Sequence, residues 1–248
     1  MTDGKLEVGG VIRKVWSIYV DQAPVLMPAA AVVFVFTGII SAVLLRAGGG
    51  GLALLATLIG LIATTLFTGM VVELVADVQD GRRDATPGQL LRAAWPVIGT
   101  LIIVALCVGV LTVVGFLLVV IPGLIALTVW SVAAPVVVLE RPPGLKAMRR
   151  SRELVAGNGW PVFGVILVVG VAVAIFSAAI EIAAETAGTG AGIIARVVLG
   201  VLTAPLSALG AAVLYFELLR VRHEGTPPAS PPPVEEEPAA QPNPFGSG

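Results

Sequence analysis

The stretch from Ala93 to Leu139, AAWPVIGTLIIVALCVGVLTVVGFLLVVIPGLIALTVWSVAAPVVVL, is 47 residues long and contains no charged side chain. A helix that crosses the hydrocarbon core of a bilayer needs about 20 predominantly apolar residues. The stretch is therefore long enough for two membrane spans. Pro122 and Gly123 lie between its two halves and are typical turn residues, so we expect the turn of a membrane hairpin there.

Four further uncharged stretches extend the pattern over most of the chain, which is 57% hydrophobic and only 12% charged. This charge content is about half of that in a soluble globular domain. We therefore predict an all-α integral membrane bundle of six spans. The predicted spans are approximately residues 24–45, 52–73, 96–120, 123–140, 161–183 and 195–217.

The basic residues alternate between the two sides of these spans. Thirteen of the fifteen Lys and Arg residues fall before the first span, in the second and fourth connections, or after the sixth span, whereas only Arg46 and Arg196 fall on the other side. Lys and Arg are enriched in the cytoplasmic loops of membrane proteins. We expect both termini in the cytoplasm, and a location in the inner or plasma membrane of a prokaryotic cell.

A repeated motif divides the membrane region, 1–222, into three similar units. Residues 95–99, WPVIG, and 160–164, WPVFG, agree at four of five positions, and each opens an apolar span. An amphipathic segment precedes each unit, at 8–21, 89–94 and 144–156, and we expect these segments to be interfacial helices on the cytoplasmic side. Each unit would then consist of an interfacial helix, an outgoing span, a returning span and a glutamate.

After the sixth span the composition changes abruptly. Residues 223–248 are rich in Pro and Glu and almost free of large apolar side chains. Such a segment cannot bury enough apolar surface to fold, so we predict a disordered cytoplasmic tail.

The three repeated glutamates, Glu73, Glu140 and Glu217, are the first candidate functional residues. Buried carboxylates in spans usually face a partner or a cavity. Because these three lie near span ends, the first interpretation is that they anchor the spans by pairing with an arginine close in sequence, such as Arg141 or Arg220. The second is that they line one polar cavity open to the cytoplasm, for a proton, a cation or a lipid headgroup.

A basic stripe beside the fifth span is the second candidate. Polybasic segments next to a membrane attract anionic lipid headgroups. The same charges would also fix the orientation of the chain, and that role alone could explain them. The candidate lipid-contacting residues are Lys146, Arg149, Arg150 and Arg152.

Catalytic chemistry finds little support in the sequence. The chain has one histidine, His223, at the start of the predicted tail. We find no nucleophile-base pair, metal-ligand cluster or phosphate-binding glycine motif. We therefore expect no enzyme activity, no catalytic residue, no cofactor and no bound metal.

The motifs VVVLE at 136–140, AMRRSREL at 147–154 and GNGWPVFG at 157–164, with IPG at 121–123, resemble an uncharacterised group of prokaryotic multi-pass membrane proteins. That group includes the membrane domain found ahead of some glycerophosphoryl diester phosphodiesterases. The resemblance implies a six-helix membrane protein without an assigned activity. The phosphodiesterase activity does not carry over, because it belongs to a separate barrel domain of roughly 250 residues.

From these patterns we expect a non-enzymatic membrane-organising or lipid-interacting accessory protein. Its partners would be membrane lipids and other membrane proteins, and not nucleic acid. The alternative is a transporter for a small solute, an ion or a lipid. The internal repeat and the acids near the span ends favour that alternative, although the spans lack strongly polar midpoints.

Overall fold

The structure, a computed structural model, describes residues 6–81, 87–187 and 189–224, and the regular elements in these ranges are all helical. Among the described residues, six helical segments are long and apolar enough to cross a membrane. The all-α, six-span bundle predicted from the sequence is thus confirmed, and the chain is a multi-pass membrane protein. The predicted tail, 223–248, begins too early, because α10 continues to Glu224, and the rest of it, from 225 onwards, lies outside the described residues. The helices are α1 (Val8–Asp21), α2 (Ala23–Ala47), α3 (Gly50–Gln79), α4 (Pro87–Ala94), the short η1 (Trp95–Val97), α5 (Ile98–Leu118), α6 (Val120–Trp130), α7 (Ala133–Leu139), α8 (Lys146–Val155), α9 (Gly159–Ala187) and α10 (Thr189–Glu224).

The turn of the central hairpin is not at Pro122 and Gly123, as we expected. Helix α5 ends at Leu118, and α6 begins at Val120, so the junction is the extended residue Val119. The N–H groups in the first turn of a helix have no partner within the helix, so a proline there loses no hydrogen bond. Pro122 is therefore compatible with the start of α6. Gly123 serves close packing, because a Cβ atom there would lie 2.6 Å from the ring of Phe116.

The fourth span is interrupted, which the sequence analysis did not predict. It consists of α6 and α7, separated by Ser131 and Val132. Pro135 accounts for the break, because it has no N–H for the carbonyl of Ser131 and its ring would clash with that carbonyl in a continuous helix. The break lies about 12 Å from the end of α7, at 1.5 Å per residue, and Val132 is completely buried.

The three predicted units form a closed ring. Each interfacial helix packs against the returning span that precedes it: α4 against α3, α8 against α7, and α1 against α10, which closes the ring. Neighbouring units also meet through their spans, in the contacts of α3 with α5, α6 with α9, and α10 with α2. The returning spans α3, α7 and α10 contact one another at the centre.

Burial separates the two kinds of span in the same way. In the most apolar segment of each returning span, 39% (α3), 44% (α6 and α7) and 39% (α10) is buried within the protein. The corresponding values for the outgoing spans α2, α5 and α9 are 11%, 11% and 6%. The repeat seen in the sequence therefore corresponds to a structural repeat with the returning spans inside.

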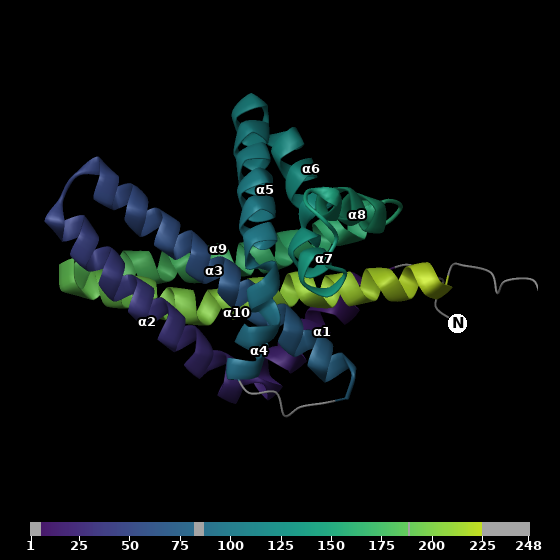
Figure 1. The fold of residues 1–248 in the computed structure, drawn as a ribbon, viewed down its shortest axis with the longest axis horizontal. Coiled ribbons are helices and arrows are strands. Elements are labelled where there is room, and N and C mark those ends of the chain that lie inside the picture. Colours follow the sequence, from purple (N-terminus) through teal and green to yellow (C-terminus); the bar gives the residue numbers. More distant parts are fainter. Residues whose placement is uncertain (1–5, 82–86, 188, 225–248) are drawn as a thin grey trace, which may run out of the picture.

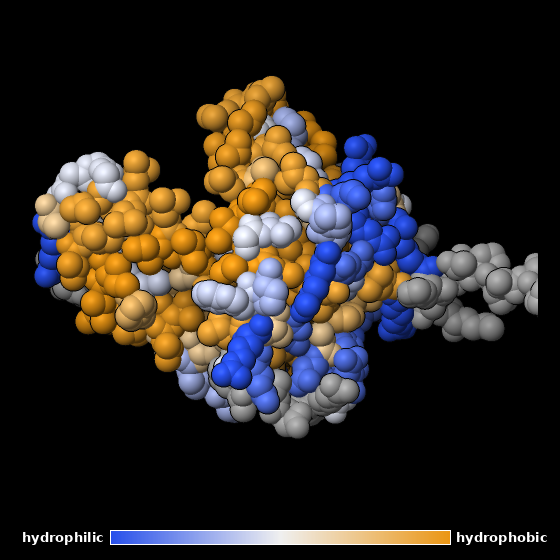
Figure 2. Space-filling model, viewed as in Figure 1, coloured by the Kyte–Doolittle hydropathy of each residue, from blue (hydrophilic) through white to orange (hydrophobic). Residues whose placement is uncertain are grey.

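The core lies toward the end of the bundle where α1, α4, α8 and the ends of α3, α7 and α10 meet. We call it the charged end, because the ion-paired side chains lie on these elements. Its largest buried side chains include Phe67, Leu101, Leu154 and Leu214. Away from this end, the α5–α6 hairpin diverges from the other spans, as Figure 1 shows. In Figure 2 the diverging parts are covered by apolar residues, and hydrophilic residues gather toward the charged end.

Candidate functional site

Glu217 joins the last span to the first interfacial helix. Its Oε1 atom lies 2.8 Å from the Nζ atom of Lys14 in α1, and its Oε2 atom lies 3.6 Å from Nη1 of Arg220. The Glu217 side chain is 17% exposed. Arg220, the cation close in sequence, thus makes only the longer contact. The shorter ion pair, with Lys14, connects helices near the two ends of the chain.

Glu140 has the most hydrogen bonds of the three glutamates. The Nε atom of Arg150 donates to both of its carboxylate oxygens, at 2.9 and 3.1 Å, and the Tyr215 hydroxyl donates to Oε1 at 3.0 Å. The hydrogen bond to Glu140 raises the pKa of the Arg150 guanidinium. These contacts join the end of α7 to α8 and α10.

Arg141 pairs with Glu73 and not with its neighbour in sequence, Glu140. The distance from Glu73 Oε1 to Arg141 Nη2 is 3.7 Å, and the same nitrogen lies 3.4 Å from the Ala93 carbonyl oxygen. Arg141 adopts a left-handed backbone conformation, with φ of 49°, just after α7 ends. This conformation is common after a helix end. The Arg141 side chain connects α3, α4 and α7, although its contacts are long.

The three candidate glutamates therefore pair with different cations, and none of the ion pairs described above shares a cation between two of them. Each joins the end of a returning span to another element of the ring, and each side chain is between 17% and 28% exposed. This arrangement favours the interpretation of the glutamates as span anchors. The sequence interpretation that Arg141 would serve its neighbour Glu140 is wrong, because the chain turns after α7 and directs Arg141 toward α3.

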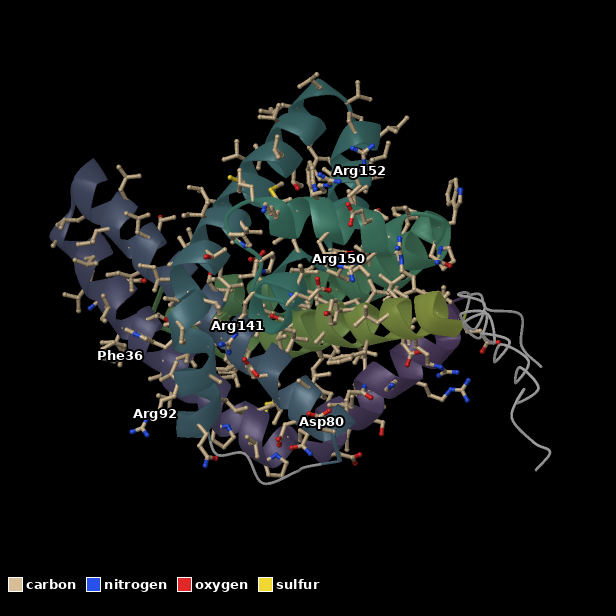
Figure 3. The ribbon with its side chains drawn as sticks, turned by 45° about the vertical axis from the view of Figure 1, so that its right-hand side comes forward. Phe36, Asp80, Arg92, Arg141, Arg150 and Arg152 are labelled. Carbon is tan, nitrogen blue, oxygen red and sulfur yellow. The ribbon has the colours of Figure 1, made fainter. Side chains whose placement is uncertain are left out.

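The four candidate cations of α8 divide into two groups. Arg150 faces Glu140, whereas Arg149, 84% exposed, pairs with Glu153 on its own helix. Lys146 and Arg152 are exposed. In Figure 3, Arg150 lies on the side of α8 nearer to Arg141, and Arg152 lies on the other side. Lys146, Arg149 and Arg152 are thus the exposed cations of α8, and of these Arg149 is already paired with Glu153.

Two hydroxyl groups at the charged end were missed by the sequence analysis. Ser151 of α8 is fully buried and donates a 2.8 Å hydrogen bond to the carbonyl oxygen of Val129 in α6. Tyr215 contacts Glu140 as described above. A serine on the apolar face of α8, and a tyrosine two residues before the repeated Glu217, were the available indications.

With six spans, a ring of three similar units and an ion-paired charged end, the structure defines a multi-pass membrane protein of repeat type. Residues 90–219, more than half of the chain, match the family described as a domain of unknown function (DUF8558). The chain belongs to this family. No curated protein and no solved structure matches it. The matched region begins within α4 and ends within α10, so it covers almost all of the second and third units.

Proposed function

We propose that this protein is a non-enzymatic accessory protein that interacts with anionic lipids and organises other components at the inner face of a prokaryotic plasma membrane. The carrying observation is the exposure of Lys146, Arg149 and Arg152 on a helix that packs directly against the spans. A cation near an anionic membrane surface contributes about 1 kcal/mol of attraction. Lys146 and Arg152, together with Arg149, which is exposed but paired with Glu153, favour anionic headgroups around the charged end.

The orientation belongs to the same proposal. The charged end would face the cytoplasm, because it carries the loops that hold most of the Lys and Arg residues. Anionic lipids in the cytoplasmic leaflet would then meet α8. The resemblance to the membrane domain that precedes some glycerophosphoryl diester phosphodiesterases is likewise part of this proposal.

Lipid analysis of the purified protein tests the proposal. We would extract the protein from its host membrane into a mild detergent, and compare the anionic fraction of the co-purifying lipids with that of the whole membrane. We expect enrichment in the native protein, and loss of enrichment in the triple variant Lys146→Gln, Arg149→Gln, Arg152→Gln.

A matched control removes the same charge elsewhere. The triple variant Arg13→Gln, Arg46→Gln, Arg92→Gln changes three cations that are exposed but lie outside α8. It should retain the enrichment. Equal lipid composition in the native protein, both variants and the whole membrane would contradict the proposal.

One observation favours transport as a second candidate function. Interrupted helices near mid-membrane are typical of transporter binding sites, and the fourth span is interrupted at Ser131 and Val132. A transport pathway through this break would admit water. In a Cys107→Ala background, a cysteine replacing Val132 would then react with a hydrophilic thiol reagent. Because Val132 is completely buried, the accessory role predicts that it does not react.

A further inference from the structure

An apolar groove of about 500 Å³ lies between α6, the last turn of α8 and the first turn of α9. Its volume falls within the roughly 300–1,000 Å³ of small-molecule sites. Along α6 it extends from Ile121 to Val129, which is about 12 Å at 1.5 Å per residue. Val155 of α8 and three residues of α9, Gly159, Trp160 and Phe163, also line the groove.

The groove presents little that could bind a polar molecule, although it lies beside the interruption of the fourth span. The Thr128 hydroxyl donates to the Leu124 carbonyl oxygen within α6, at 2.8 Å. The carbonyl oxygen of Val129 accepts the hydrogen bond from Ser151. The hydroxyl and the carbonyl next to the break are therefore occupied, and the surface left open along α6 suits a hydrocarbon chain.

Charge and aromatic groups lie where such a chain would reach the membrane surface. Arg152 is exposed and lies one helical turn before Val155, so it is on the part of α8 next to the groove. Trp160, 85% exposed, stands in the first turn of α9, and tryptophan favours the headgroup level of a bilayer. The apolar groove thus lies beside the part of α8 that carries an exposed cation.

We propose that this groove binds one anionic phospholipid, with an acyl chain along α6 and the phosphate near Arg152. This inference rests on the proposed function, because it assigns one defined binding site to the general attraction between anionic lipids and the charged end. Complementarity of charge with Arg152 selects an anionic headgroup, and the apolar wall selects the chain.

Fluorescence of Trp160 tests this site directly. We would replace Trp16, Trp95 and Trp130 by Phe, reconstitute the full chain in phosphatidylcholine vesicles, and add either brominated phosphatidylglycerol or brominated phosphatidylcholine, which quench tryptophan on contact. At equal mole fraction, phosphatidylglycerol should quench Trp160 several-fold more effectively. A matched protein that keeps only Trp95, the equivalent residue of the second unit, should show no such preference.

Two substitutions separate the chain site from the charge. Gly159→Leu should fill the groove without a clash, since a Cβ atom there meets nothing within 4 Å, and it should remove the preference. Arg152→Gln should lower it about fivefold, as expected for one cation at the surface. Arg92→Gln, at an exposed position of α4, is the charge control and should leave the preference unchanged.

The outcomes distinguish this site from the proposed function. Equal quenching of Trp160 by both lipids, or a preference that survives Gly159→Leu, would overturn the groove site. If the purified protein still enriched anionic lipids in that case, the proposed function would stand and only the site would fail. If the enrichment were also missing, both would fail.

Discussion

The buried hydroxyl of Ser151 donates a 2.8 Å hydrogen bond to the carbonyl oxygen of Val129, across the boundary between the second and third units. The last four carbonyls of a helix have no partner within that helix, and Val129 lies in the last turn of α6. The amphipathic helix α8 thus supplies a hydrogen bond to the interrupted span. This contact satisfies a carbonyl that the interruption of the fourth span leaves without a partner within α6.

Replacing Ser151 by Ala should destabilise the protein. The substitution removes the donor and leaves a buried carbonyl without its partner, which costs about 1–3 kcal/mol. We expect a lower midpoint of thermal unfolding in detergent. Ser17→Ala is the control, because Ser17 is exposed on α1. Equal midpoints for the Ser151 variant and the native protein would show that the contact carries no stability.

The ion pair that closes the ring, Lys14 with Glu217, should be measurable by a double-mutant cycle. Both side chains are partly buried, and their charged atoms lie 2.8 Å apart. With Lys14→Gln and Glu217→Gln, we expect a coupling free energy of about 1 kcal/mol, within the range for residues in contact. The same cycle on Arg149 and Glu153, a more exposed pair, should give about 0.5 kcal/mol or less. Equal coupling in the two cycles would contradict the closing role of Lys14.

The three glutamates should differ in the effect of a Gln substitution. Glu140 accepts three hydrogen bonds, Glu217 has a short ion pair with Lys14 and a longer one with Arg220, and Glu73 has a long contact with Arg141. We therefore expect the loss of thermal stability to increase from Glu73→Gln to Glu217→Gln to Glu140→Gln. As separate anchors, their effects should add within about 0.5 kcal/mol. Strong non-additivity in the triple variant would instead favour the shared cavity.

Hydropathy predicted the six spans because the length and polarity of a membrane helix are local properties of the sequence. The amphipathic segments and the WPV motifs also indicated three similar units. The closed ring could not be predicted in this way, because the contact of α1 with α10 joins residues about two hundred positions apart. Pro135 is present in the sequence, but the hydropathy of an uncharged stretch does not show whether its helix is continuous.

Of the partners expected from closeness in sequence, Arg220 does contact Glu217, whereas Arg141 contacts Glu73 and not its neighbour Glu140. The repeated glutamates do lie at the ends of returning spans, as the repeat indicated. Their pairing depends on where the chain turns after each span. The left-handed conformation of Arg141 directs its side chain to Glu73, so the nearest cation in sequence was a poor guide to the nearest cation in space.

The orientation of the protein can be tested by labelling of introduced cysteines. The distribution of Lys and Arg predicts that the α2–α3 and α9–α10 hairpins turn outside the cell. In intact cells and a Cys107→Ala background, cysteines replacing Gly51 and Thr189 should react with a membrane-impermeant thiol reagent. Cysteines replacing Asp80 and Pro143, at the charged end, should react only after the membrane is opened, and this second step shows that they are reactive. Labelling of Asp80→Cys and Pro143→Cys in intact cells, without labelling at the hairpin positions, would reverse the orientation and would place the α8 cations outside the cell, away from the cytoplasmic leaflet on which the proposed function depends.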